Sequence, residues 1–301
     1  MENILLIFIC IGIGIGLQRV PAFPKNGYLA LNQYVIYVAL PAMTLYYIPK
    51  IELNATLLYP VLVPWIGFFV AFLFFYSLGK LFHWPKKLVG ALILTAGLGN
   101  TSFVGFPLVK AFFGEAGLKA AILVDQPGTF VVLSTAGVFT ASYFASGTAS
   151  WRSTLRKVAV FPPFIAFAIA GTLLLFQMDF PEAMQGVCKQ LGATVSTVAL
   201  LSVGLQLKLG QRSKHWGFLT LGLVFKLVLT PLLFVFLYKI VIPGKGLLVD
   251  VSLIESAMPP MISGAILASN YGLKPKLSNL MVGVGIPLSL LTVYLWYLLL
   301  I

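Results

Sequence analysis

The sequence has few charged residues. Only 9% of its 301 residues are charged, whereas 59% are hydrophobic. Soluble globular domains carry about a quarter charged residues, so a water-soluble fold is excluded. The formal net charge of +12 comes from basic residues in short loops between apolar runs. That placement is typical of a protein in contact with membrane lipid and excludes nucleic acid as a partner.

Cysteine and histidine are also scarce. Cys10 and Cys188 lie in or beside apolar runs and lack the spacing of a disulfide framework or a metal site. His83 and His215 each precede a tryptophan at an apolar boundary, where aromatic anchors are expected. The sequence contains no P-loop, no H-E-x-x-H and no paired catalytic aspartates. We therefore expect no metal, no cofactor, no coupling to ATP within this chain and no enzymatic activity.

Long apolar runs account for almost the whole sequence. Runs long enough to cross a bilayer fall at 3–18, 28–48, 57–82, 88–112, 118–146, 158–177, 184–207, 215–241, 247–271 and 277–300. We predict an all-α integral membrane protein with ten transmembrane helices. The first run is expected to be a span rather than a signal peptide, because no basic leader or A-x-A cleavage site accompanies it.

Basic residues are concentrated in alternate loops. The richer set includes the loops around Arg19, Lys86, Arg152, Arg212 and Lys274. Because cytoplasmic loops carry an excess of Lys and Arg, these loops are predicted to face inward, and both termini to face outward.

The two halves of the chain resemble each other. When the chain is shifted by about 160 residues, Leu31 falls on Leu191, 38–40 on 198–200, and Pro127 on Pro287. Each half holds five spans, an odd number, so the second half enters the membrane from the opposite face. The sequence therefore predicts a 5+5 inverted repeat, with halves 1–150 and 151–301.

A polar, glycine-rich stretch from Gly97 to Pro107 interrupts the fourth apolar run. Asn100 lies about a dozen residues in from Lys87, which places it about 18 Å deep, near the bilayer midplane. Unpaired backbone groups are costly at that depth, so irregular chain survives only where protein or trapped water satisfies it. Gly99, Gly105 and Pro107 are the expected helix-breaking residues. A broken helix at the midplane is typical of a transporter's substrate site.

A second interruption is predicted in the ninth run, from Glu255 to Gly264. Pro259 and Pro260 remove two backbone donors and clash with the preceding turn. A kinked helix without a site is the alternative, but two breaks at equivalent places in inverted halves favour a site. Pro260 and Pro107 can each begin a second half-helix. Two half-helix N-termini would then meet at the midplane, where their positive dipole ends favour an anion.

These residues resemble a known family. The segment from Gly99 to Leu108 is similar to the GN-x-x-F-x-G-x-P-L signature of the auxin efflux carrier family in its bacterial branch. Weaker similarities are Leu31-Asn32, 38–41, Met258-Pro259 and Tyr271-Gly272. Plant members carry a long cytosolic loop in mid-chain, whereas about a dozen residues join the halves here.

The resemblance implies an elevator transporter with the fold of bile acid symporters and sodium/proton antiporters. It implies a scaffold (1–50 and 158–207) that carries a homodimer contact, and a mobile transport domain (57–146 and 215–300) in which the two broken helices cross. It also implies a bacterial cytoplasmic membrane location and a small organic anion, such as malate or malonate, as substrate.

Several residues are candidates for substrate contact. Asn100 offers two donors and an acceptor, although capping of the broken backbone is an alternative role. Thr101 and Ser102 either bind substrate or bond back to their own helix. The corresponding candidates in the ninth run are Met258, Pro259, Pro260 and Ser263.

Lys226 is an unusual charge because it lies inside an apolar run. At that depth a lysine costs about 2.5 to 3.5 kcal/mol unless it is paired or faces water. Glu255 reaches a similar depth and is the predicted partner, whereas Asp125 lies nearer the outer surface and is the second choice. The group is either a structural ion pair or a coupling site, where the ammonium replaces sodium or a carboxylate takes up a proton.

We therefore expect a secondary transporter that exports or exchanges a small organic anion, such as a mono- or dicarboxylate. A sodium-coupled symporter of the bile acid type is the alternative within the same fold. A channel or a receptor is the alternative from another class.

Overall fold

The computed structural model describes residues 2–52, 54–145, 160–207 and 216–301. Its regular elements are helical, and no strand forms among these residues, so the all-α prediction is confirmed there. The α-helices are α1 (Glu2–Leu17), α2 (Gly27–Tyr34), α3 (Leu40–Tyr47), α4 (Leu58–Leu81), α5 (Lys86–Gly97), α6 (Phe106–Val124), α7 (Val138–Ala145), α9 (Pro162–Leu175), α10 (Glu182–Gln206), α11 (Trp216–Val224), α12 (Thr230–Phe236), α13 (Leu247–Ser256), α14 (Ile262–Asn270) and α15 (Pro275–Leu300). The predicted linker between the halves and the start of the eighth span lie outside the described residues.

Six helical stretches are long and apolar enough to cross a membrane. They are Gly27–Lys50, Ala55–Leu81, Thr101–Ala145, Glu182–Gln206, Trp216–Val241 and Pro275–Leu300. Two shorter apolar helices, Leu5–Leu17 and Pro162–Leu175, accompany them. These stretches are those of a multi-pass membrane protein.

One of these stretches contains two helices. Gly114 has φ 65° and ψ −159°, and the two parts of α6 meet there. Glycine adopts a positive φ without the steric cost that a Cβ would add. The 45-residue stretch Thr101–Ala145 therefore turns at Gly114, close to the boundary predicted between the fourth and fifth runs.

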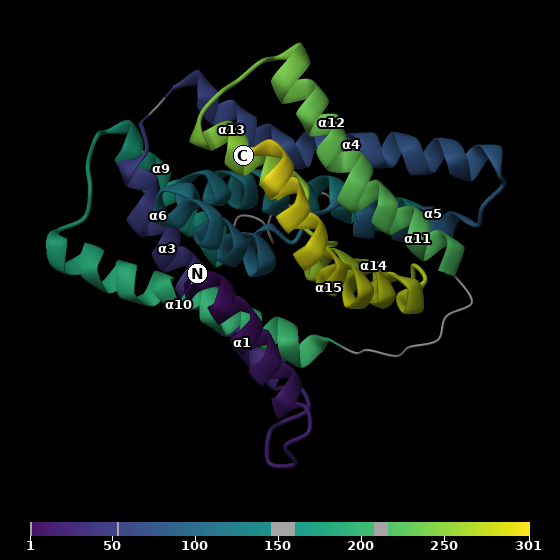
Figure 1. Cartoon of the computed structure of the whole chain (residues 1–301), viewed down its shortest axis with the longest axis horizontal. Helices are drawn as coiled ribbons and strands as arrows, with labels where there is room; N and C mark the ends of the chain where they lie inside the picture. Colours follow the sequence, from purple (N-terminus) through teal and green to yellow (C-terminus); the bar gives the residue numbers. More distant parts are fainter. Residues whose placement is uncertain (1, 53, 146–159, 208–215) are drawn as a thin grey trace.

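One group of helices packs around α10. Helices α1, α2 and α3 lie against α10, and α9 lies against α3 (Figure 1). Gly14 of α1 and Gly204 of α10 meet where the two helices are closest, and a Cβ on either would overlap the other helix's backbone. Small residues allow this close approach. Gly12 and Gly16 have no such neighbour and face away from α10.

A second group surrounds α5. Helices α4, α7, α14 and α15 pack against it, and α13 packs against α4 and α6. The core of this group includes the fully buried side chains of Phe75, Leu92 and Leu277. Because α5 has no exposed residue from Leu88 onward, its end at Gly97 lies deep within the protein.

Candidate substrate site

Two interrupted segments pair through their backbones. Helix α5 ends at Gly97 and a π-helical segment, η4 (Thr101–Gly105), begins after Asn100; α13 ends at Ser256 and α14 begins at Ile262. The Asn100 amide donates to the Pro259 carbonyl at 2.8 Å, and the Met261 amide donates to the Leu98 carbonyl at 3.0 Å. We call this pairing of 98–100 with 257–261 the crossing. Each segment satisfies backbone groups of the other.

Asn100 caps the segment η4 and keeps one side-chain donor unpaired. Its Oδ1 accepts from the Phe103 amide at 3.2 Å, and its backbone carbonyl accepts from the Gly105 amide at 3.0 Å. The side chain therefore caps η4. Its Nδ2 has no hydrogen-bond partner, although the residue is only 2% exposed. A buried donor without a partner is costly, so this amide is available to a ligand.

Glycines allow the crossing to form. A Cβ on Gly99 would lie 3.2 Å from Lys226 Nζ, and one on Gly105 would lie 2.5 Å from Glu255 Oε2. A Cβ on Gly264 would lie 2.8 Å from the Leu94 carbonyl oxygen. Larger residues at these three positions would displace the charged side chains or separate α14 from α5.

Lys226 and Glu255 both lie at the crossing, but no ion pair joins them. Lys226 Nζ instead donates to the Ser256 carbonyl at 3.1 Å. Both carboxylate oxygens of Glu255 are buried without a hydrogen-bond partner. The structure thus places the ammonium beside the residue that follows Glu255. An unpaired buried carboxylate is costly, which makes Glu255 the most unusual polar group among the described residues.

Asp125 is hydrogen-bonded to Thr101, which follows directly after the crossing residue Asn100. Thr101 Oγ1 donates to Asp125 Oδ1 at 2.7 Å and lies 3.1 Å from Thr129 Oγ1. Asp125 is 4% exposed, and its bond with Thr101 places it beside the crossing. The structure therefore links the fourth and fifth runs through Thr101 and Asp125.

The three buried polar groups share a backbone feature. Thr101 lies on η4, Asp125 on η5 (Asp125–Phe130) and Lys226 on η7 (Phe225–Leu229), and all three segments are π-helical. Such turns occur frequently at functional sites. The sequence analysis did not single out Thr129, which stands one helical turn after Asp125, or the Ser256 carbonyl. The four-residue spacing from Asp125 to Thr129 was the available signal.

Some of the other residues predicted to contact substrate lie at the crossing, and others lie away from it. Ser102, Met258, Pro259 and Pro260 are buried at the crossing. Ser263 is half-buried and lines a different cavity of about 260 Å³. Pro107 is the second residue of α6 and borders a cavity that faces α10.

Comparison with known proteins identifies the family. A family model described as membrane transport protein matches residues 1–297. The chain belongs to this family. The resemblance to the auxin efflux carrier family is thereby confirmed over the whole chain, and the family is one of transporters rather than enzymes.

Two curated relatives of the transporter are archaeal. A protein named as an uncharacterized transporter of Methanocaldococcus jannaschii is 30% identical over 304 residues, which cover 98% of this transporter and 97% of the relative. Another uncharacterized transporter, from Methanothermobacter thermautotrophicus, is 24% identical over 302 residues, with 98% and 96% covered. Both matches therefore extend over essentially the full length of the transporter.

Proposed function

We propose that this transporter is a secondary active carrier that exports or exchanges a small organic anion, such as a mono- or dicarboxylate. The observation that carries the proposal is the unpartnered Nδ2 of Asn100, buried at the crossing. Helix α14 and the η4–α6 segment both begin there, so their N-terminal amides add partial positive charge. A carboxylate accepts hydrogen bonds from such groups and is attracted by the Lys226 ammonium.

The 5+5 inverted repeat is part of this proposal. Gly99 pairs with Pro260 in an antiparallel bridge, and the two positions differ by nearly the 160 residues that relate the halves. On this reading the interrupted segments are equivalent elements of the two halves, 1–150 and 151–301. The two shorter apolar helices, Leu5–Leu17 and Pro162–Leu175, the turn at Gly114 and the interrupted pair α13–α14 account for the four spans beyond the six long stretches.

An elevator mechanism follows from a division into scaffold and transport domain. The packing of α1, α2 and α3 with α10, and of α9 with α3, supports a scaffold of 1–50 and 158–207. Hydrogen bonds such as Gln18 to the Gly204 carbonyl lie within it, and the bond from Tyr238 to the Tyr59 carbonyl lies within the transport domain of 57–146 and 215–300. Lys119 Nζ joins the two by donating to the Lys50 carbonyl at 2.8 Å.

Coupling is proposed to involve the buried charges. Lys226 provides a fixed positive charge where a sodium-coupled symporter would bind its ion, and Glu255 or Asp125 is the group that would carry a proton. Among the described residues, no cluster of three or more His, Cys, Asp or Glu side chains is suited to a metal ion. The symporter of the bile acid type, which would hold its ion largely with backbone carbonyls at the helix breaks, is the second candidate.

The proposed location is a cytoplasmic membrane with both termini outside.

The outward face of α1 includes Phe8, Ile9 and Ile13, which are about half exposed, and the uncovered Gly12 and Gly16. Apolar side chains beside small residues suit helix–helix contact in lipid. This face is the proposed homodimer contact of the scaffold.

Uptake into proteoliposomes tests the proposal. Mono- and dicarboxylates, auxin-like aromatic acids and bile acids would be offered under imposed sodium, proton or voltage gradients. We expect uptake of at least one carboxylate by the wild type, loss of that uptake in Asn100→Ala, and retention in Asn270→Ala, whose side chain is exposed on α14. Transport of neutral or cationic solutes alone would refute the anion site. Currents far above carrier rates in planar bilayers would indicate a channel.

A further inference from the structure

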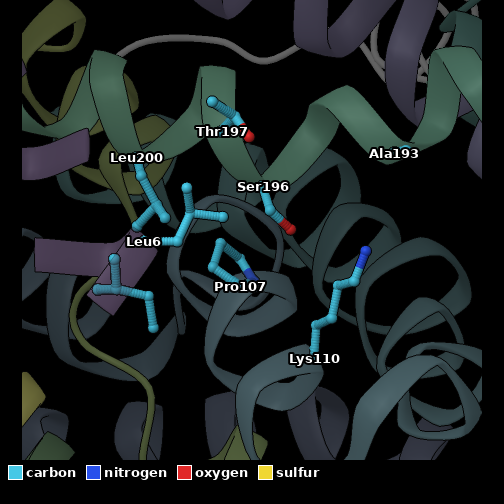
Figure 2. Close-up of a pocket in the computed structure, with 8 residues that line it drawn as sticks. Leu6, Pro107, Lys110, Ala193, Ser196, Thr197 and Leu200 are labelled. Carbon is cyan, nitrogen blue, oxygen red and sulfur yellow. The ribbon is translucent and has the colours of Figure 1, made fainter. Parts of the chain in front are cut away.

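Two adjoining cavities lie between α6 and α10, outside the crossing. The first has a volume of about 50 Å³ and is bordered by Pro107, Lys110, Ser196, Thr197 and Leu200 (Figure 2). Figure 2 shows Lys110 extending from α6 and the Ser196 hydroxyl extending from α10 into the space between the two helices. One wall is therefore from the proposed transport domain and the other from the proposed scaffold.

The second cavity continues the first. It has a volume of about 30 Å³, shares Lys110 and Ser196, and adds Tyr47, Glu115 and Lys189. We call the two cavities together the basic tract. The tract extends from Lys189, near the start of α10, to Pro107, the second residue of α6. Because α10 also packs against η4, the inner end of the tract adjoins the segment that Asn100 caps.

The polar groups of the tract suit a carboxylate. The tract contains the two ammonium groups of Lys110 and Lys189 and one carboxylate, that of Glu115, whose Oε1 lies 3.9 Å from Lys110 Nζ. The net charge of the tract side chains is therefore positive. The Ser196 and Thr197 hydroxyl groups can each donate a hydrogen bond to a carboxylate or accept one from another ligand group. An ammonium with adjacent hydroxyls forms short, charge-assisted hydrogen bonds to a carboxylate oxygen.

We propose that the basic tract is a second anion-binding site, which receives a small carboxylate before it reaches the crossing. Lys110 supplies the main charge, Ser196 and Thr197 donate to the same carboxylate group, and Lys189 raises the local concentration of the anion at the entrance. The inference rests on the proposed function for the identity of the transported solute. The affinity of the tract for an anion is measurable without transport.

Cysteine labelling measures the charge of the tract directly. Ser196→Cys would be placed in a Cys10→Ala, Cys188→Ala background, since both native cysteines are free and buried. An anionic methanethiosulfonate reagent should react faster than a cationic one, and saturating malonate should slow the reaction. Lys110→Gln should lower the anionic-to-cationic rate ratio about threefold or more. Lys245→Gln, a neutralised exposed lysine away from the tract, should leave the ratio unchanged.

Two results would overturn the proposal. The first is an equal labelling rate for the anionic and the cationic reagent, with no change on Lys110→Gln. This result would show that the tract has no positive potential. Failure of malonate, acetate and succinate to slow labelling would show that it binds no carboxylate. If Ser196→Cys fails to fold, Thr197→Cys provides the same measurement from the next residue.

Transport kinetics separate this inference from the proposed function. Lys110→Gln and Lys189→Gln should raise the KM for the transported carboxylate about tenfold with little change in maximal rate, and Lys245→Gln should do neither. If the wild type transports no carboxylate, the proposed function fails, and labelling alone decides the tract. If the wild type transports one and both variants match Lys245→Gln in KM and labelling, the tract proposal is wrong.

Discussion

Gly105 lies directly against the carboxylate of Glu255. A Cβ at Gly105 would lie 2.5 and 2.6 Å from the two carboxylate oxygens. Contact between η4 and α13 therefore requires a residue without a side chain at position 105. The same two oxygens have no hydrogen-bond partner among the described residues. The position of this buried acid is therefore fixed by packing rather than by hydrogen bonds.

Gly105→Ala should destabilise the transporter and abolish uptake. The added methyl group would force Glu255 or η4 to move, and overpacking of this kind costs about 1 to 3 kcal/mol. Thermal unfolding of the purified protein in detergent measures the loss. Gly171→Ala is the control, because nothing lies within 4 Å of an added Cβ there. Equal unfolding temperatures for the two variants would contradict the packing argument, whereas recovery in the Gly105→Ala, Glu255→Ala double variant would support it.

Thr101→Val should impair folding and uptake through Asp125. The substitution removes the hydroxyl that donates to Asp125 Oδ1, and a buried acceptor that loses its partner costs about 1 to 3 kcal/mol. Thr101→Ser retains the hydroxyl and should remain close to wild type. Thr172→Val, which removes a hydroxyl from exposed α9, is the stability control. A Thr101→Val variant as stable and active as Thr172→Val would show that the bond to Asp125 has no role.

Lys226→Ala should either abolish transport or make it sodium-dependent. Removal of the ammonium leaves Glu255 and the Ser256 carbonyl without the positive charge that now lies beside them, and a sodium ion can replace it. Uptake with sodium or choline in the external buffer distinguishes these results. Lys239→Ala, which removes an ammonium paired with Asp250 at the protein's exterior, is the control. Unchanged uptake without a new ion requirement would exclude a coupling role for Lys226.

Lys119→Met should shift the conformational equilibrium of the transporter. The variant loses the hydrogen bond to the Lys50 carbonyl, which joins the two proposed domains. One such bond contributes about 1 kcal/mol, or about a fivefold change in population. Spin labels at exposed Leu58 and Met184, in the cysteine-free background, would report the distance distribution between the domains. A distribution identical to that of Lys245→Met would show that the bond does not restrain the domains.

The sequence predicted the family and the residues of the candidate site better than it predicted their contacts. Prolines and glycines explain why α5 and α13 end where they do, and those residues are readable directly. The pairing of Lys226 with Glu255 rested on equal depth in the membrane. Depth gives the height of a residue but not the direction in which its side chain points around the helix. In the structure, Lys226 points to the carbonyl of Ser256 instead.

The sequence also does not show which face of α1 packs against another helix. Gly12, Gly14 and Gly16 alternate along α1, and the four-residue spacing of Gly12 and Gly16 is typical of a helix-packing face. The structure places Gly14 against α10, because Gly204 is the residue there that lets the two backbones approach. A pattern on one helix cannot identify its partner glycine almost 200 residues away. The face with Gly12 and Gly16 remains uncovered within this chain.

The backbone pairing at the crossing has a consequence for biosynthesis. The Leu98 carbonyl and the Asn100 amide find their partners in Met261 and Pro259, which the ribosome adds about 160 residues later. Until then, two strong polar groups would stand unpaired in hydrocarbon, at a cost of several kcal/mol each. The first half of the chain therefore cannot settle into its final membrane position by itself. We expect it to wait at the insertion machinery, or in contact with water, until the second half has been synthesised.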